Sequence, residues 1–315
     1  MTRSHHRRAF VLLLVAVAFV ASASHAAEPL RLRLNEGDRY LYEHTLETTT
    51  DVAIPFPQTT TQTMRYTLDQ RVQEVDPETG NATIEVRFLR VFVESDLGEM
   101  GGFKVDTDED SEQSDTYRQL IDRPFTMRIT PRGKLLEVKG LTAIVRSMLA
   151  AGGLNAFSLE QVEGIVGDES MTGMYQALQP IYPEDGAREW ETESSISLPM
   201  MGSAAVHVLW TLGAPREVGG VATIPMSSIG EIATASEPTQ IPLEFGEMEL
   251  RLKKMTSRGV IDISAEDGWP VKGEITSNGT MSMELKIPGI AIPTSANMTV
   301  TSVAVVERLE LPSDE

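Results

Sequence analysis

Histidines are the first residues to weigh for chemistry, because an imidazole can bind zinc or act as a general base near neutral pH. The chain has five histidines and no cysteine. His5, His6 and His25 fall in an N-terminal targeting segment, which leaves His44 and His207, each within a strand pattern. No Gly-x-Ser-x-Gly, Ser-x-x-Lys, His-Glu-x-x-His, phosphate-loop or dinucleotide motif accompanies them. We therefore assign no catalytic residue and no cofactor, and we expect a protein that is not an enzyme.

An acidic stretch offers the one candidate for a metal site. Asp106, Asp108 and Asp110 alternate as the oxygen ligands of calcium loops do. An EF-hand loop also needs glycine at its sixth position and glutamate at its twelfth, where this chain has Ser111 and Tyr117. The pattern therefore favours a solvated loop between strands, with a calcium site as the alternative.

Paired carboxylates could also hydrolyse a glycosidic bond, and the chain has 46 acidic residues. Sugar clefts need aromatic faces, but aromatic residues make up only 6% of the chain. The tryptophans are Trp190, Trp210 and Trp269, and the first two occupy strand positions that favour core packing. A carboxylate-based hydrolase is therefore kept only as an alternative.

The turns between the expected strands are unusual because several are apolar and contain proline, where hairpin turns are normally polar. The most apolar positions in them are Ile54, Phe56, Met200, Met201 and Ile290. These turn tips could line the mouth of a cavity for a hydrophobic molecule, cap the ends of the β-structure, or face a partner protein. The 15 methionines would suit an adaptable apolar lining.

The N-terminus has the layout of a secretory signal, with arginines, an apolar run and small residues ending at Ala26. Cleavage there predicts export to the periplasm or beyond, by the general or the twin-arginine route, as a product without a membrane span. The formal net charge of −19 becomes more negative once the signal and its arginines are removed. Such a chain would repel nucleic acid, so we expect no nucleic-acid partner.

Similar sequence phrases recur along the mature chain and indicate a tandem repeat. Phrases around Gly37, Gly80 and Gly133 return around Gly186, Gly220 and Gly268. Residues 1–26 form the signal, and we expect β-rich repeats at 27–180 and 181–315. The fold class is mainly β, with two duplicated, curved antiparallel sheets, as half-barrels or a sandwich. A short helical segment from about 141 to 180 separates them, with individual helices near 141, near Ser158 and from about 169 to 178.

Several of these phrases together resemble a family of exported bacterial β-rich proteins of unknown function. They are Gly37-Asp38-Arg39-Tyr40, Tyr66-Thr67-Leu68, Gly80 with Ala82-Thr83-Ile84, Phe125 to Thr130, Gly133, and Val138-Lys139-Gly140. The resemblance covers most of the mature chain and transfers no activity. At the level of fold alone, the expected curved sheets are distantly similar to the half-barrels of periplasmic lipoprotein carriers.

The sequence therefore favours an exported, non-catalytic binding protein of the bacterial envelope. Its partner would be a hydrophobic small molecule or lipid, or an envelope protein. A structural or protein-interaction module without a small ligand is the alternative. An apolar cavity of several hundred cubic ångströms beneath the helices would favour the ligand.

Overall fold

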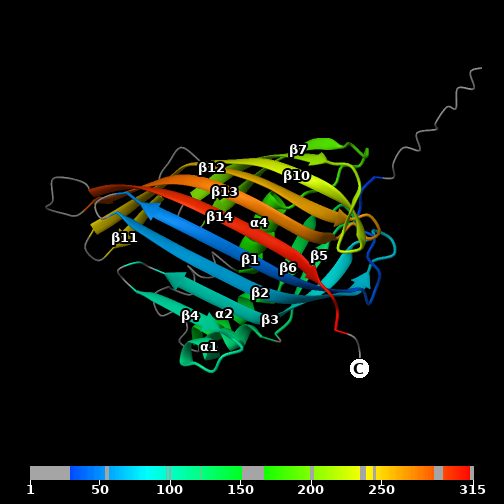
Figure 1. The fold of residues 1–315 in the computed structure, drawn as a ribbon, viewed down its shortest axis with the longest axis horizontal. Coiled ribbons are helices and arrows are strands. Elements are labelled where there is room, and N and C mark those ends of the chain that lie inside the picture. Colours follow the sequence, from blue (N-terminus) through cyan, green and yellow to red (C-terminus); the bar gives the residue numbers. More distant parts are fainter. Residues whose placement is uncertain are drawn as a thin grey trace, which may run out of the picture.

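The computed structural model describes residues 29–53, 57–96, 98, 101–121, 123–150, 167–198, 202–234, 239–243, 246–286 and 294–312. In this part of the chain, one antiparallel sheet of 14 strands dominates (Figure 1). The strands of its first half are β1 (Arg39–Val52), β2 (Gln58–Val75), β3 (Ala82–Asp96), β4 (Gly102–Asp106), β5 (Phe125–Ile129) and β6 (Leu135–Lys139). Those of its second half are β7 (Glu189–Leu198), β8 (Gly202–Leu212), β9 (Arg216–Val218), β10 (Val221–Thr234), β11 (Thr239–Leu243), β12 (Gly246–Ser264), β13 (Pro270–Lys286) and β14 (Thr294–Leu309).

The main path of the sheet runs β6-β5-β3-β2-β1, then β14, then β13-β12-β10-β8-β7. The predicted β class is therefore confirmed, and the two predicted halves are joined into one sheet. Strand β14 makes the junction, because it pairs with β13 on one side and with β1 on the other. Buried side chains from both halves also form one core.

The strand order within each half is the same if β1, β2, β3, β5 and β6 correspond to β7, β8, β10, β12 and β13. The repeated glycines fall in corresponding turns or strand entries, and all have positive φ: Gly37 and Gly186, Gly80 and Gly220, Gly133 and Gly268. Gly268 shows why no side chain fits, since a Cβ there would lie 2.2 Å from the carbonyl oxygen of Arg31. The tandem duplication itself stays a prediction.

The strands are long because β-branched and aromatic residues alternate with polar ones, which gives each strand a buried and a solvated face. In β3, for example, Ile84 and Val86 are buried whereas Thr83 and Glu85 are not. We call the face that carries the buried core side chains the inner face of the sheet, and the opposite one the outer face.

The helices are α1 (Glu112–Tyr117), the 3-10 turn η2 (Arg118–Leu120), α2 (Leu141–Ala150) and α4 (Asp168–Leu178). Helices α2 and α4 match two of the three predicted helices, and the one predicted near Ser158 lies outside the described residues. Helix α4 packs against both β6 and β7, the two edge strands of the described sheet (Figure 1). The open sheet is therefore bridged by a helix at its edges.

Candidate ligand-binding face

The inner face of the sheet is almost free of charge. Register and alternation place Tyr40, Tyr42, His44, Leu46 and Thr48 of β1 on this face. The adjacent inward-facing positions of β13 and β14 carry mainly Met, Val, Ile, Ala, Gly and Ser. Arg308 is the only charged residue at an inward-facing position of the described strands. Such a lining suits an apolar molecule.

Burial along this face changes from one end of the sheet to the other. Near the start of β1, Tyr40 is 8% and Tyr42 2% exposed, so side chains fill the interior there. Leu46 lies further along the same face and is 37% exposed. Several inward-facing methionines of this region are half-buried: Met64, Met255, Met281, Met283 and Met298. Apolar surface on the inner face is thus left without a covering in the described chain.

His44 and Tyr66 lie side by side where the filled and unfilled regions meet. Their rings are stacked at a centroid distance of 4.9 Å and an angle of 10°. Burial lowers the pKa of His44 to about 4, so its imidazole is neutral at physiological pH. Burial raises the pKa of Tyr66, with a smaller contribution from Tyr175 of α4. Neither ring makes a hydrogen bond within the described part of the chain.

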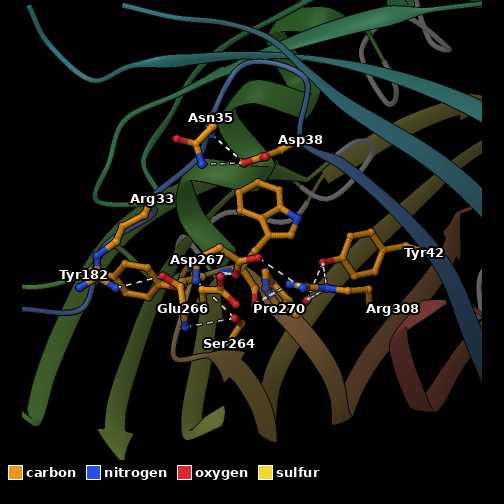
Figure 2. A network of polar contacts seen from close by, with 12 residues as sticks. Arg33, Asn35, Asp38, Tyr42, Tyr182, Ser264, Glu266, Asp267, Pro270 and Arg308 are labelled. Carbon is orange, nitrogen blue, oxygen red and sulfur yellow. Dashed lines mark hydrogen bonds and ion pairs between the residues drawn. The ribbon is translucent and has the colours of Figure 1, made fainter. Parts of the chain in front are cut away.

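The filled end of the sheet is held by a polar network around Arg308 (Figure 2). The Arg308 guanidinium donates to the carbonyl oxygens of Trp269 and Pro270, each at 3.1 Å. It also pairs with Asp267 at 3.3 Å and lies over the ring of Tyr40 at 4.9 Å. These contacts tie the turn between β12 and β13 to β1 and β14, the strands that join the two halves.

The segment before β1 also lies at the filled end of the sheet, where it contacts turns from both halves. The backbone amide of Leu32 donates to Pro131 in the turn after β5, and that of Arg33 donates to Asp267 in the turn after β12. The Tyr182 hydroxyl donates to the carbonyl oxygen of Gly268 at 3.0 Å (Figure 2). The β5–β6 and β12–β13 turns are thereby fixed to one another.

Helix α4 uses a stripe of polar side chains to pair with the edge of the sheet. Thr172 Oγ1 accepts a hydrogen bond from the Val138 amide at 3.0 Å, and Gln176 Nε2 donates to the Leu135 carbonyl at 2.8 Å. One turn earlier, Asp168 accepts from the amide of Thr142 at 2.9 Å. These three side chains are spaced by four residues and share one helix face. Thr172 and Gln176 satisfy backbone groups that the edge strand β6 would otherwise leave free, whereas Asp168 caps the first turn of α2.

Replacing Thr172 with valine keeps the shape of the side chain and removes the acceptor for the Val138 amide. We expect the free energy of unfolding to fall by about 1–2 kcal/mol and exchange of the Val138 amide hydrogen to accelerate. Denaturant titration and hydrogen exchange would measure both. Met174→Ala, on the exposed side of the same helix, serves as the control and should leave the exchange of Val138 unchanged. Unaltered exchange in T172V would contradict the assigned role.

The sequence-predicted turn residues Ile54, Phe56, Met200, Met201 and Ile290 all lie outside the described residues. The strands that flank them do, however, end on the same side of the sheet. Val52 is paired with both Gln58 and Met298, and Leu198 with Gly202. This side is opposite to the Arg308 network, since Leu41 and Leu309 pair at the other end of β1. The unfilled part of the inner face extends toward these strand ends.

The acidic stretch is organised by arginines. Asp106 is buried and bound by Arg90 through two bonds of 2.6 and 3.1 Å, which hold the pKa of its carboxyl below the usual range. Asp108 also pairs with Arg90, at 3.0 Å, whereas Asp110 pairs with Arg118 at 2.8 Å. No group of three or more metal-ligating side chains occurs among residues that the structure describes. The favoured interpretation, a solvated loop, is therefore corrected at Asp106, whose side chain is buried and paired with Arg90.

A cavity of about 300 Å³ lies on the outer face of the sheet. Its lining is polar and charged: Glu74, Asp76, Asn81, Thr83, Thr126, Arg128, Glu137 and Lys139. Glu137 and Lys139 form an ion pair at 2.8 Å. The cavity is thus separate from the inner face and unlike the apolar site that the turns suggested.

Reasoning from sequence gave no role to Leu46, and it treated His44 as a structural residue. The alternation Tyr40-Tyr42-His44-Leu46 was the available signal, because it places a histidine in line with two core tyrosines. The α4 stripe was also missed, although the spacing of Asp168, Thr172 and Gln176 marks one helix face.

A model described as "Family of unknown function (DUF6263)" matches residues 79–270, more than half of the chain. The chain belongs to the DUF6263 family. No curated protein sequence matches this DUF6263 protein significantly. In the described part of it, no helix combines the length and hydropathy needed to cross a membrane.

Among solved structures, this DUF6263 protein is similar to lipovitellin, with 8% identity and a TM-score of 0.50. The match covers 90% of this chain and 26% of the lipovitellin chain. It is also matched to the LolA superfamily protein NE2245 from Nitrosomonas europaea at 8% identity and a TM-score of 0.14, over 89% of this chain and 90% of that chain. The first likeness concerns the fold alone, and the second is too low to support an argument.

Proposed function

We propose that this DUF6263 protein is an exported binding protein that holds a hydrophobic molecule against the inner face of its curved sheet. The observation that carries the proposal is the exposure of Leu46, an apolar side chain on the core side of the sheet. An apolar surface on a core face stays uncovered only at an energetic cost of roughly 25 cal/mol per Å², which a ligand would recover. Export rests on the N-terminal signal pattern alone.

The fold likeness to lipovitellin is compatible with this proposal, because that structure is described by its lipid–protein interactions. A solid interior at one end and uncovered apolar surface toward the other would give a site with one entrance. Strands β1, β7 and β13 end on the side where that entrance would lie.

Leu46→Lys should weaken the binding of an apolar fluorescent probe at least about tenfold, because the ammonium would be placed on the uncharged inner face. Val260→Lys is the matched control, since Val260 is 41% exposed but lies on the outer face of β12. Leu46→Trp guards against misfolding, because it fills the same space without charge and should also lower probe binding. Equal binding by the Leu46 variants and the control would contradict the proposal.

A protein-interaction module remains the second candidate, favoured by one observation on the outer face. Ile229 of β10 is 55% exposed and lies diagonally across from Val260, so the two apolar side chains are neighbours in solvent. A partner envelope protein could cover them. Crosslinking in the native envelope through a photoreactive residue at position 229 would reveal such a partner.

A further inference from the structure

The inner face contains almost no charge, and this restricts the chemical class of ligand that it can bind. On the described strands its one inward-facing charged residue is Arg308, which lies at the filled end and is engaged by Asp267, Tyr42 and backbone carbonyl oxygens. Along the unfilled part, the inward-facing positions after His44 in β1 and before Val306 in β14 are apolar or carry hydroxyl groups. A charged ligand group placed there would find no counter-ion on the described strands.

The same face does offer neutral hydrogen-bonding groups. His44 and Tyr66 are stacked and without hydrogen-bond partners in the described chain, and they stand between the filled and the unfilled regions. Further along β2, toward the filled end, the buried side-chain oxygen of Gln70 also lacks a partner. On the other side, Thr48 and Thr50 of β1 face inward. Fully buried polar atoms in proteins are normally paired, so the unpaired Gln70 oxygen points to a missing donor. The polar atoms of His44 and Tyr66 are not among the fully buried unpaired atoms, so a ligand on the unfilled side could reach them.

A buried ion without a partner is strongly disfavoured, whereas a hydroxyl or ester group can satisfy a neutral imidazole and a phenol. The lack of charge on the inner face and the neutral groups of His44 and Tyr66 therefore disfavour fatty-acid anions and cationic amphiphiles as ligands. They also select against a pure hydrocarbon, which would leave the imidazole and the phenol unsatisfied.

We infer that the ligand is an uncharged lipid with a hydroxyl or ester group, of the monoacylglycerol class. Its polar group would lie at His44 and Tyr66, and its chain would run along Leu46 and the methionines of β13 and β14. This inference rests on the proposed function and specifies its ligand.

The test compares three amphiphiles of equal chain length on the mature protein: a monoacylglycerol, the fatty-acid anion at mildly alkaline pH, and the alkyltrimethylammonium cation. Isothermal titration below the micelle concentrations would give the affinities. We expect the monoacylglycerol to bind and both ions to bind at least about tenfold more weakly. Binding of either ion as tightly as the monoacylglycerol would overturn the inferred class and leave the proposed function standing. Failure of all three and of an apolar probe would overturn both.

Variants at the stacked pair then locate the polar group. Tyr66→Phe and His44→Phe keep an aromatic ring and remove the hydrogen-bonding atoms. We expect each to weaken monoacylglycerol binding about fivefold to tenfold, and to do so more than it weakens binding of a hydrocarbon probe. Equal losses for both ligands would contradict the placement, because they would indicate a change of shape only. Ser302→Ala, an inward-facing hydroxyl on β14, would show the effect of losing a hydroxyl elsewhere on this face.

Discussion

Arg308→Met is expected to lower the free energy of unfolding by roughly 3–5 kcal/mol, the largest single-residue loss that we predict. The Arg308 side chain is 19% and that of Asp267 18% exposed, so this is a largely buried pair. Removing the guanidinium leaves the Asp267 carboxylate, the Tyr42 hydroxyl and two backbone carbonyls with fewer donors. Equilibrium denaturation of the mature protein, with and without the substitution, measures the change.

Lys272→Met provides the comparison, because Lys272 forms an exposed ion pair with Glu307 at 3.4 Å near the same strand ends. Exposed pairs contribute about 0–1 kcal/mol. Arg308→Lys keeps the charge but loses the planar fork, so its stability should fall between those of the wild type and R308M. A loss for R308M no larger than for K272M would show that the network does not stabilise the junction of the two halves.

Acid should destabilise the protein through His44. The pKa of this imidazole is lowered from 6.5 to about 4 by burial, so the unfolded chain binds a proton at a pH where the folded chain does not. Above about pH 6.5 the imidazole is neutral in both states, so His44 does not lower the free energy of unfolding. As the pH falls from about 6.5 toward about 4, only the unfolded chain becomes protonated, and the free energy of unfolding decreases. The total over that range is about 3 kcal/mol, of which about 2 kcal/mol is lost between pH 7 and pH 5.

His44→Gln removes this titration while leaving every carboxylate in place. Its unfolding free energy should therefore fall by about 2 kcal/mol less than that of the wild type between about pH 7 and pH 5. Urea titrations of the ligand-free proteins at both pH values would give the difference. If both proteins lose the same stability, His44 is hydrated in the folded state and burial does not lower its pKa.

The class of the fold and the positions of α2 and α4 could be predicted because they depend on local patterns, whereas α1 and η2 lie in and just after the acidic stretch, where the sequence favoured a loop. Alternating residues mark strands, and the run around Ile144, Val145 and Met148 has the spacing of a helix. The repeated glycines were also visible, and their positive φ values explain why glycine recurs there. On the matching strand order and these turns, we propose that the two halves arose by tandem duplication.

The junction of the halves could not be predicted, because it depends on register between distant segments. Arg308 and Tyr42 are separated by 266 positions, and nothing local to either indicates that they meet. The same limit applies to the inner face. Leu46 is one apolar residue within a threonine-rich strand, and only the pairing of β1 with β2 and β14 shows which way it points. The predicted turn residues remain candidates for the entrance of the site.

Whether the inner face holds a hydrophobic molecule can be tested by native mass spectrometry of the mature protein purified from its own envelope, followed by denaturation and extraction. We expect a stoichiometric, extractable, apolar molecule that is released on unfolding. We also expect Leu46→Lys to be recovered without this molecule while Val260→Lys retains it. Recovery of the wild-type protein at the mass of the bare chain, under conditions that preserve other lipid complexes, would contradict the account.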